Sequence, residues 1–244
     1  MGSIFSFVQM AFRKNKPNRL KFIGNLLLKG VGWFFALTFF WVFIYKFINP
    51  PLTYLMVERG FERKFNSKPW KIVKDWKNYD EISNNLKKAA LAGEDARFMI
   101  HNGFDFKAIE RAYQRNKSPK KLRGGSTISQ QTAKNVFLWN GRSYLRKAFE
   151  AYFTVLIELL WSKQRILEVY LNVIETGDGI YGAEAATQTY YGKSCHRLTK
   201  SQAALLIACL PNPRRWSPAK PTAFIYHRQY LILRNMRNLS RVRF

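Results

Sequence analysis

The 244-residue chain is long enough for one globular domain and a short anchor, and for little more. Hydrophobic residues make up 47% of the chain and charged residues 23%, a balance that excludes both a disordered chain and a polytopic membrane protein. The 41 lysines and arginines against 15 acidic residues give a formal net charge of +26, so the expected partners are polyanions: nucleic acid, anionic lipid headgroups or a phosphorylated substrate.

The first predicted elements are a basic N-terminus, residues 1–21, and an apolar segment, residues 22–48. Within that segment Gly30–Tyr45 contains no charged residue and is rich in Phe and Trp. With its flanks it is long enough to cross a hydrocarbon core of about 30 Å, so it is predicted to be a transmembrane anchor. The alternatives are a buried helix of a soluble protein and a cleaved signal peptide. The length of the run, and the lack of a small-residue cleavage site after it, favour a retained anchor.

The charges around this segment predict its orientation. Basic residues precede it, and no acidic residue occurs before Glu58. The positive-inside rule therefore places the N-terminus in the cytoplasm and the rest of the chain outside, where nucleic acid is not an expected partner. Residues 49–80 are predicted to be a membrane-proximal linker. Four of its apolar residues are expected to be exposed at the membrane surface: Leu52, Tyr54, Leu55 and Met56.

Residues 81–244 are predicted to form an extracytoplasmic, mainly α-helical domain, because no clean period-two strand pattern occurs there. The first helix contains Leu86 and is predicted to end near Gly103. Further helices are predicted from Thr127 to Asn135, from Ser143 as N-cap to about Trp161, and at 165–172, 183–191 and 203–210. The long helix is expected to bury this stripe: Leu145, Phe149, Tyr152, Leu156, Leu159 and Leu160. Cys209 is expected to be a small core residue, and no Cys/His cluster has metal-ligand spacing.

One candidate for chemistry lies on the first of these helices. Glu94, Phe98 and His101 are spaced i, i+4 and i+7 and are expected to share one helix face, whereas Asp95 is expected to point elsewhere. An aromatic neighbour can raise the pKa of a carboxyl group towards the range that a general base needs. The alternative is a solvated glutamate near a helix end.

A second candidate is Glu150, which follows Arg146 and Lys147 at helical spacing. These residues either form ordinary surface ion pairs or hold a carboxylate where a phosphate binds. In the second interpretation the cations Lys134, Arg142, Arg146 and Lys147 neutralise a pyrophosphate, and Ser126, Thr127 and Gln131 donate hydrogen bonds at a helix N-terminus. Two carboxylates and a cationic cluster suit glycosyl transfer from a sugar pyrophosphate, although spacing alone does not decide whether the glutamates meet.

Five ordered segments covering roughly residues 85–220 resemble the motifs of the peptidoglycan glycosyltransferases, glycosyltransferase family 51. They begin with Glu-Asp-Ala-Arg-Phe-Met-Ile-His-Asn-Gly at 94–103 and Gly-Gly-Ser-Thr-Ile-Ser-Gln-Gln-Thr-Ala-Lys-Asn at 124–135, and continue at 146–158, 163–193 and 198–213. Ser129, Thr132 and Cys195-His196 depart from the expected pattern, but none occupies a presumed catalytic position.

The resemblance implies a lysozyme-like helical fold with a head lobe and a membrane-proximal jaw lobe. It also implies an inverting enzyme that transfers the growing glycan from undecaprenyl pyrophosphate to the 4-hydroxyl of the N-acetylglucosamine of lipid II, forming β-1,4 links. By this resemblance Glu94 is the general base, and Glu150 lies at the donor phosphates as a proton donor, a cation ligand or a positioning group.

The resemblance also assigns the surrounding residues. Substrate binding is implied for Ser126, Thr127, Gln131, Lys134, Asn135, Arg142, Arg146 and Lys147, and a supporting role for Asp95, Phe98 and His101. No organic cofactor is implied, and a divalent cation at the pyrophosphate is left open. Because the chain ends at Phe244, no transpeptidase domain is expected, which is typical of the monofunctional members of the family.

Lipid II, the lipid-linked glycan strand, the membrane and other wall-synthesis proteins are the expected partners. The expected location is the bacterial inner membrane, with a single span and a periplasmic catalytic domain. Two alternatives remain at this stage. A lytic muramidase-like enzyme is opposed by the cationic cluster, since a neutral glycan has no pyrophosphate to neutralise. A non-catalytic scaffold is opposed by the retention of both glutamates.

Overall fold

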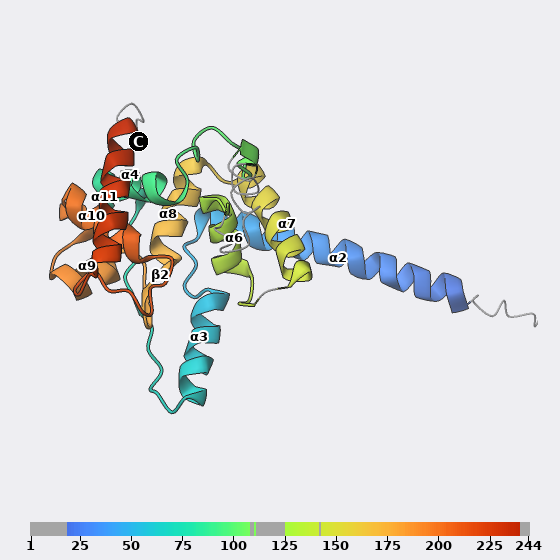
Figure 1. Ribbon diagram of the computed structural model, residues 1–244. Coiled ribbons are helices and arrows are strands. Elements are labelled where there is room, and N and C mark those ends of the chain that lie inside the picture. Colours follow the sequence, from blue (N-terminus) through green and yellow to red (C-terminus); the bar gives the residue numbers. More distant parts are fainter. Residues whose placement is uncertain (1–18, 108–109, 111–124, 142, 240–244) are drawn as a thin grey trace, which may run out of the picture. The chain divides into compact units, whose positions relative to one another are not determined.

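The computed structural model describes residues 19–107, 110, 125–141 and 143–239 (Figure 1). Contacts divide the chain into two compact units, residues 1–41 and 42–244, which are described separately. The predicted basic N-terminus lies almost wholly outside the described residues.

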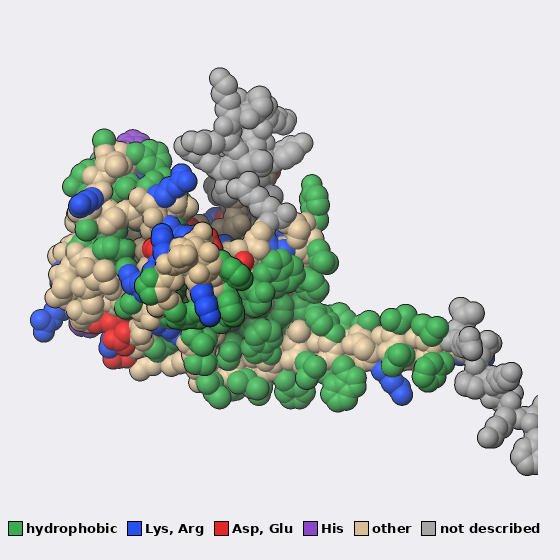
Figure 2. Space-filling view, turned by 90° about the horizontal axis from the view of Figure 1, so that it is seen from below, with side chains coloured by type: hydrophobic (Ala, Val, Ile, Leu, Met, Phe, Trp, Pro, Cys, Tyr) green, Lys and Arg blue, Asp and Glu red, His purple; other side chains and the backbone are tan. Residues whose placement is uncertain are grey.

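The first unit contains most of helix α2, Arg19–Phe47. Among the described residues, one helical segment is long and apolar enough to cross a membrane, Lys21–Phe47, with a mean hydropathy of 1.8. Hydrophobic side chains cover its surface in Figure 2, and Leu28 and Trp33 are 72% and 67% exposed. Such exposure does not fit the buried helix of a soluble protein. The segment is therefore compatible with a single-pass membrane anchor.

The second unit begins with the last turn of α2, which is tied to two helices described below. The indole Nε1 of Trp161 donates a hydrogen bond to the carbonyl oxygen of Val42 at 2.9 Å. The guanidinium of Arg165 donates to the carbonyl oxygens of Tyr45 and Ile48 at 2.9 and 3.0 Å. Of these carbonyl groups, that of Tyr45 is among those that the end of a helix otherwise leaves without partners.

Helix α3, Tyr54–Phe65, occupies the predicted linker and begins at the N-cap Thr53. Leu52 and Tyr54 are about half exposed, as predicted. The prediction that Leu55 and Met56 face the membrane surface is wrong, since they are 6% and 0% exposed. Helix α3 was not predicted, and its periodicity turns these two side chains into the core.

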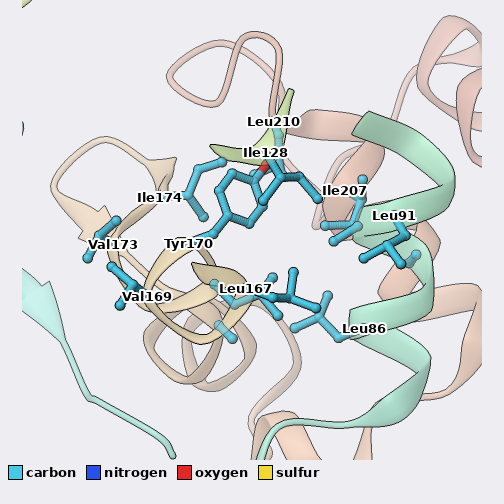
Figure 3. Close-up of a cluster of buried hydrophobic side chains, with 14 of the residues drawn as sticks. Leu86, Leu91, Ile128, Leu167, Val169, Tyr170, Val173, Ile174, Ile207 and Leu210 are labelled. Atoms are coloured by element: carbon cyan, nitrogen blue, oxygen red, sulfur yellow. The ribbon is translucent and has the colours of Figure 1, made fainter. Parts of the chain in front are cut away.

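The core lies between helices that meet in two groups. Helix α10 packs against α4 and α11, and helix α6 packs against α7 and α8. Their bounds are α4, Asn84–Glu94; α6, Ile128–Phe137; α7, Tyr144–Leu160; α8, Lys163–Val173; α10, Lys200–Cys209; and α11, Ala223–Asn238. Figure 3 shows Leu86 of α4, Ile128 of α6, Tyr170 of α8 and Ile207 of α10 in one apolar cluster. The mainly helical fold is thus confirmed.

The remaining elements are short. They are η1, Tyr79–Glu81; α9, Ala183–Tyr191; η2, Cys195–Arg197; and three strands, β1, Val73–Lys74; β2, Glu175–Gly177; and β3, Ile180–Tyr181. The strands and η2 contact α9, and η1 and α9 contact α8. The strand order is β1-β3-β2, with β1 parallel and β2 antiparallel to β3. Strands of two or three residues are too short to show a period of two, so the sequence did not predict this sheet.

Several helix predictions are confirmed, and the predicted apolar stripe of α7 is confirmed in part. The capping boxes at Thr127 and Thr199 begin α6 and α10, Ser143 caps α7, and Cys209 is a buried core residue. On α7, four residues of the stripe pack against the core, whereas Leu145 and Leu159 are 63% and 75% exposed; the four are Phe149, Tyr152, Leu156 and Leu160. The buried side chains are Glu150, Phe153, Thr154 and Ile157. The apolar face of α7 is therefore wider than its packed face.

Candidate active site

Helix α4 places Glu94 at its last position. The backbone of Asp95 leaves helical geometry, with φ −158° and ψ 79°, and the following residues form turns. The prediction of a helix running to Gly103 is therefore wrong, and Glu94, Phe98 and His101 do not share a helix face. The chain leaves the helix because the carboxylate of Asp95 has partners elsewhere.

Asp95 joins the end of α4 to the start of α6. Both of its carboxylate oxygens lie 2.9–3.0 Å from Nε2 of His101, and Oδ2 accepts a hydrogen bond from the backbone N–H of Ile128 at 3.0 Å. A carboxylate at a helix N-terminus is stabilised by the N–H groups that have no partner within the helix. Asp95 and His101 are buried, so Asp95 orients α6 relative to Glu94.

The N-terminus of α6 is further held by Thr127. Its hydroxyl donates to the carbonyl oxygen of Gly103 at 2.6 Å and accepts from the N–H of Gln130 at 3.2 Å. Thr127 is 2% exposed, so the structure engages its hydroxyl within the fold. Ser126, one residue earlier, is exposed. Of the two hydroxyl groups predicted to face substrate, the structure leaves that of Ser126 at the surface.

Helix α6 carries the hydrogen-bond partner of Glu94. Nε2 of Gln131 donates to Oε2 of Glu94 at 2.9 Å, and Oε1 of Gln131 lies 3.5 Å from the hydroxyl of Tyr170. Surrounding protein raises the pKa of Glu94 by desolvation, although the residue keeps some surface exposure. The hydrogen bond from Gln131 and the charges of Arg228 and Lys134 oppose this increase. A carboxylate with a raised pKa suits a general base.

Phe98 and His101 support the site from the turns after α4. Phe98 is fully buried, and Nζ of Lys163 lies 4.6 Å from the centre of its ring. The same Nζ donates to the carbonyl oxygen of His101 at 2.6 Å and to Oε1 of Glu158 at 2.8 Å. Ser129 also donates to Oε1 of Glu158. These contacts fasten the turn region to α7 and α8.

The second carboxylate, Glu150, lies on α7 and is only 3% exposed. Nη1 of Arg146 donates to its Oε2 at 2.7 Å, and Nζ of Lys147 pairs with its Oε1. Arg146 also donates through Nε to the carbonyl oxygen of Gly141 at 2.8 Å. The predicted pairs exist, but Glu150 is buried, so they are not ordinary surface ion pairs.

Lys134 connects the two carboxylates electrostatically. It lies one turn after Gln131 on α6, and it makes no ion pair within the part of the chain that the structure describes. Burial, and then the charges of Arg146 and Lys147, lower the pKa of Lys134, while the charge of Glu150 opposes the decrease. The charge of Lys134 in turn limits the rise in the pKa of Glu94 that burial causes. One cation thus lies within electrostatic range of both predicted catalytic residues.

A cavity of about 210 Å³ opens beside this group. Gln131, Lys134 and Asn135 of α6 line one part of it. The other lining residues are Leu55, Arg59, Asn140, Ile174, Glu175, Leu210, Pro211 and Pro213. None of these eight was predicted as a site residue, because they come from segments far apart in the sequence.

One predicted substrate-binding residue and the possible metal site remain to be placed. Arg142 lies outside the described residues. Within the described ranges, no group of three or more His, Cys, Asp or Glu side chains is arranged to hold a metal ion. The expectation of a site without a resident cofactor stays a prediction.

The sequence is similar to a known family over most of its length. The transglycosylase family model matches residues 64–237. A biosynthetic peptidoglycan transglycosylase from Pseudomonas syringae pv. tomato is 49% identical over 221 residues, which cover 91% of this chain and 94% of that protein. A protein of the same name from Pseudomonas fluorescens is 48% identical, covering 91% and 92%. Another from Caulobacter vibrioides is 54% identical over 187 residues, covering 77% and 79%.

Proposed function

The chain belongs to the transglycosylase family, and from that premise we propose that it polymerises lipid II with Glu94 as general base. It is a peptidoglycan glycosyltransferase with the lysozyme-like helical fold of the family, and it acts in glycan-strand polymerisation for the cell wall. The substrates at the level of lipid II, the residue roles and the membrane orientation are the proposal.

The environment of Glu94 carries the assignment of the base. Its hydrogen-bond partner is the neutral amide of Gln131, and burial raises the pKa of its carboxyl group. In the proposed reaction Glu94 removes the proton from the 4-hydroxyl of the acceptor N-acetylglucosamine. The hydroxyl oxygen attacks the anomeric carbon of the donor, and the bond from that carbon to the pyrophosphate oxygen breaks. The product is a β-1,4 link, formed with inversion, and undecaprenyl pyrophosphate.

The cations near Glu150 suit the leaving group. Lys134 has no ion-pair partner among the described residues, so its ammonium group is available to a phosphate oxygen. Both oxygens of Glu150 are engaged by Arg146 and Lys147. We therefore assign Glu150 as a positioning group that holds these two cations where negative charge develops. Ser126, Asn135 and Arg142 are proposed as further contacts to the donor.

The proposed membrane location rests on the N-terminal basic segment and the apolar helix that follows it. We propose one membrane span with a cytoplasmic N-terminus, because basic residues precede the apolar helix and acidic residues do not. Residues 1–21, 22–48, 49–80 and 81–244 are the proposed cytoplasmic, transmembrane, membrane-proximal and periplasmic segments. The proposed site is the bacterial inner membrane, where lipid II, the lipid-linked glycan and other wall-synthesis proteins are met.

Purified wild-type protein and the Glu94→Gln variant, incubated with radiolabelled lipid II, test the proposal. The expected result is polymer from the wild type that a muramidase digests, and a polymerisation rate lower by roughly 10²–10⁴-fold for the variant. Asp80→Asn, which alters an exposed carboxylate, is the control. Folded wild-type protein that shortens preformed glycan strands without extending them would establish the lytic alternative. Absence of both activities would leave the scaffold alternative.

A further inference from the structure

The cavity beside Glu94 has a side that the proposed mechanism does not use. Glu175 begins strand β2 and is only 6% exposed, and Asn140 precedes helix α7. Both line the cavity together with Arg59 of α3. We call these three residues the polar wall. It comes from elements that carry none of the catalytic residues proposed above.

The polar wall contains two polar atoms without partners. Oε1 of Glu175 and Nδ2 of Asn140 are buried and form no hydrogen bond with any described residue. Native proteins rarely keep a buried polar atom without a partner unless it has a use, because desolvation of such an atom destabilises the fold. One of the two atoms is an acceptor, and the other is a donor.

Ion pairs join two residues of the polar wall to each other and to residues outside the cavity lining. Nε of Arg59 donates to Oε2 of Glu175 at 3.2 Å, and Nη1 of Arg59 donates to Oε2 of Glu62 at 2.6 Å. Arg214 pairs with the other oxygen of Glu62 at 3.0 Å. Oε2 of Glu175 is thereby occupied, which holds the carboxylate near Arg59 and leaves Oε1 without a partner among the described residues. Such support is typical of groups that orient a ligand.

The lining also indicates what the cavity accepts. The α6 side offers the ammonium group of Lys134, which suits a phosphate, and the polar wall offers one acceptor and one donor. Arg59, Gln131 and Asn135 add further polar groups, and one part of the lining is apolar: Leu55, Ile174, Leu210, Pro211 and Pro213. A secondary amide next to a sugar phosphate matches all three features, because its N–H donates, its carbonyl accepts and its methyl group is apolar.

We propose that this cavity binds the 2-acetamido group of the sugar that carries the pyrophosphate. Oε1 of Glu175 accepts a hydrogen bond from the amide N–H, and Nδ2 of Asn140 donates to the amide carbonyl. Both atoms are buried, so binding requires the two side chains to rotate towards the cavity. The inference rests on the proposed function and makes Glu175 and Asn140 determinants of specificity for an N-acetylated donor.

A purely structural role for Glu175 is the rival explanation. Glu175 lies opposite Tyr181 in the β2–β3 pairing, and the hydroxyl of Tyr181 also has no partner among the described residues. If Tyr181 were the intended donor to Glu175, removing that hydroxyl would have the same effect as altering Glu175. Tyr181→Phe is therefore a matched control, and Glu62→Gln tests the support behind Arg59 without touching the cavity lining.

The experiment compares two substrates with the full-length protein in detergent. One is lipid II, and the other is the same molecule with a hydroxyl in place of the acetamido group next to the pyrophosphate. The wild type is expected to use the analogue with a KM higher by about 10-fold or more. Glu175→Gln and Asn140→Ala are expected to raise the KM for lipid II by about 10-fold and about 5-fold and to discriminate less between the two substrates, with kcat changed less.

The outcomes separate the inference from the function on which it rests. Unchanged discrimination in both Glu175→Gln and Asn140→Ala, with lipid II polymerised normally, overturns the inference alone. Equal loss of discrimination in Tyr181→Phe overturns it in favour of the structural explanation. Absence of polymer from the wild type overturns the proposed function and the inference with it. Together with the expected losses above, an unchanged KM and melting temperature in Tyr181→Phe, and a rise in KM in Glu62→Gln that is smaller than in Glu175→Gln, support the inference.

Discussion

The two glutamates of the site lie in opposite surroundings. Glu94 ends α4, accepts a hydrogen bond from the uncharged side chain of Gln131, and has its pKa raised by burial. Glu150 lies within α7 and is held by Arg146 and Lys147. A carboxylate that no cation holds in a direct ion pair can take up a proton during the reaction. A carboxylate that is paired with two cations is better suited to orienting those cations. The same residue type thus acquires two roles from its neighbours.

Removing Glu150 should give the largest effect on stability. In Glu150→Ala, the guanidinium of Arg146, whose side chain is 12% exposed, loses its charged partner while it stays buried. The expected loss is about 3 kcal/mol in the free energy of unfolding. Thermal unfolding in detergent measures it. Asp80→Asn, at an exposed carboxylate, should leave the melting temperature unchanged, and an equally unchanged value for Glu150→Ala would contradict the buried pairing.

The second-largest loss of stability is expected on substitution of Asp95, because its contacts are structural although it is adjacent to Glu94. Asp95→Ala removes the acceptor for the N–H of Ile128 and the partner of the buried His101. The expected loss of stability is about 2 kcal/mol. Asp95→Asn keeps an acceptor for the helix and should lose less. Unfolding curves of the two variants that coincide would show that the link to α6 is not what Asp95 contributes.

The acidic limb of the pH profile tests the environment of Glu94. The base must be ionised, so activity is lost as the pH falls through its pKa. Because that pKa is raised, the acidic limb of kcat/KM should lie above the 4.5 of an ordinary glutamate. Gln131→Met removes the hydrogen bond that lowers the pKa of Glu94, so the limb should move to still higher pH. A limb that moves to lower pH would refute the assignment of Glu94.

The smallest expected effect is a gain in stability for Glu94→Gln. The pKa of Glu94 is higher in the folded than in the unfolded chain, so its contribution to stability is present below the unfolded pKa and is lost as the pH rises through the folded one. At pH 7 the variant should therefore melt at a higher temperature than the wild type, by about 2–4 °C per kcal/mol in a chain of this size. The difference should vanish in acid; a constant difference would point to another cause.

Much of the helical fold was predictable because its signals are local. Capping boxes at Thr127 and Thr199 and the N-cap Ser143 place the starts of three helices within a few residues of sequence. Helix α3 was missed although Thr53 caps its start and Arg63 and Lys64 lie in its last turn, and Leu55 and Met56 were misplaced with it. The end of α4 was misplaced because Asp95 binds Ile128, 33 residues later, which no local pattern reveals.

The sequence by itself determined the apolar segment, the helical class and the glutamates and cations of the candidate site, since these depend on residue type and short spacings. Only the tertiary structure decided how deeply each group is buried and which distant residues contact it. It buried Glu150 between two cations, placed Gln131 against Glu94, and turned Asp95 into a link between helices. It also brought Glu175 and Asn140 to one cavity. Burial and contacts between distant segments arise only on folding, and they raise the pKa of Glu94 and set the role of each carboxylate.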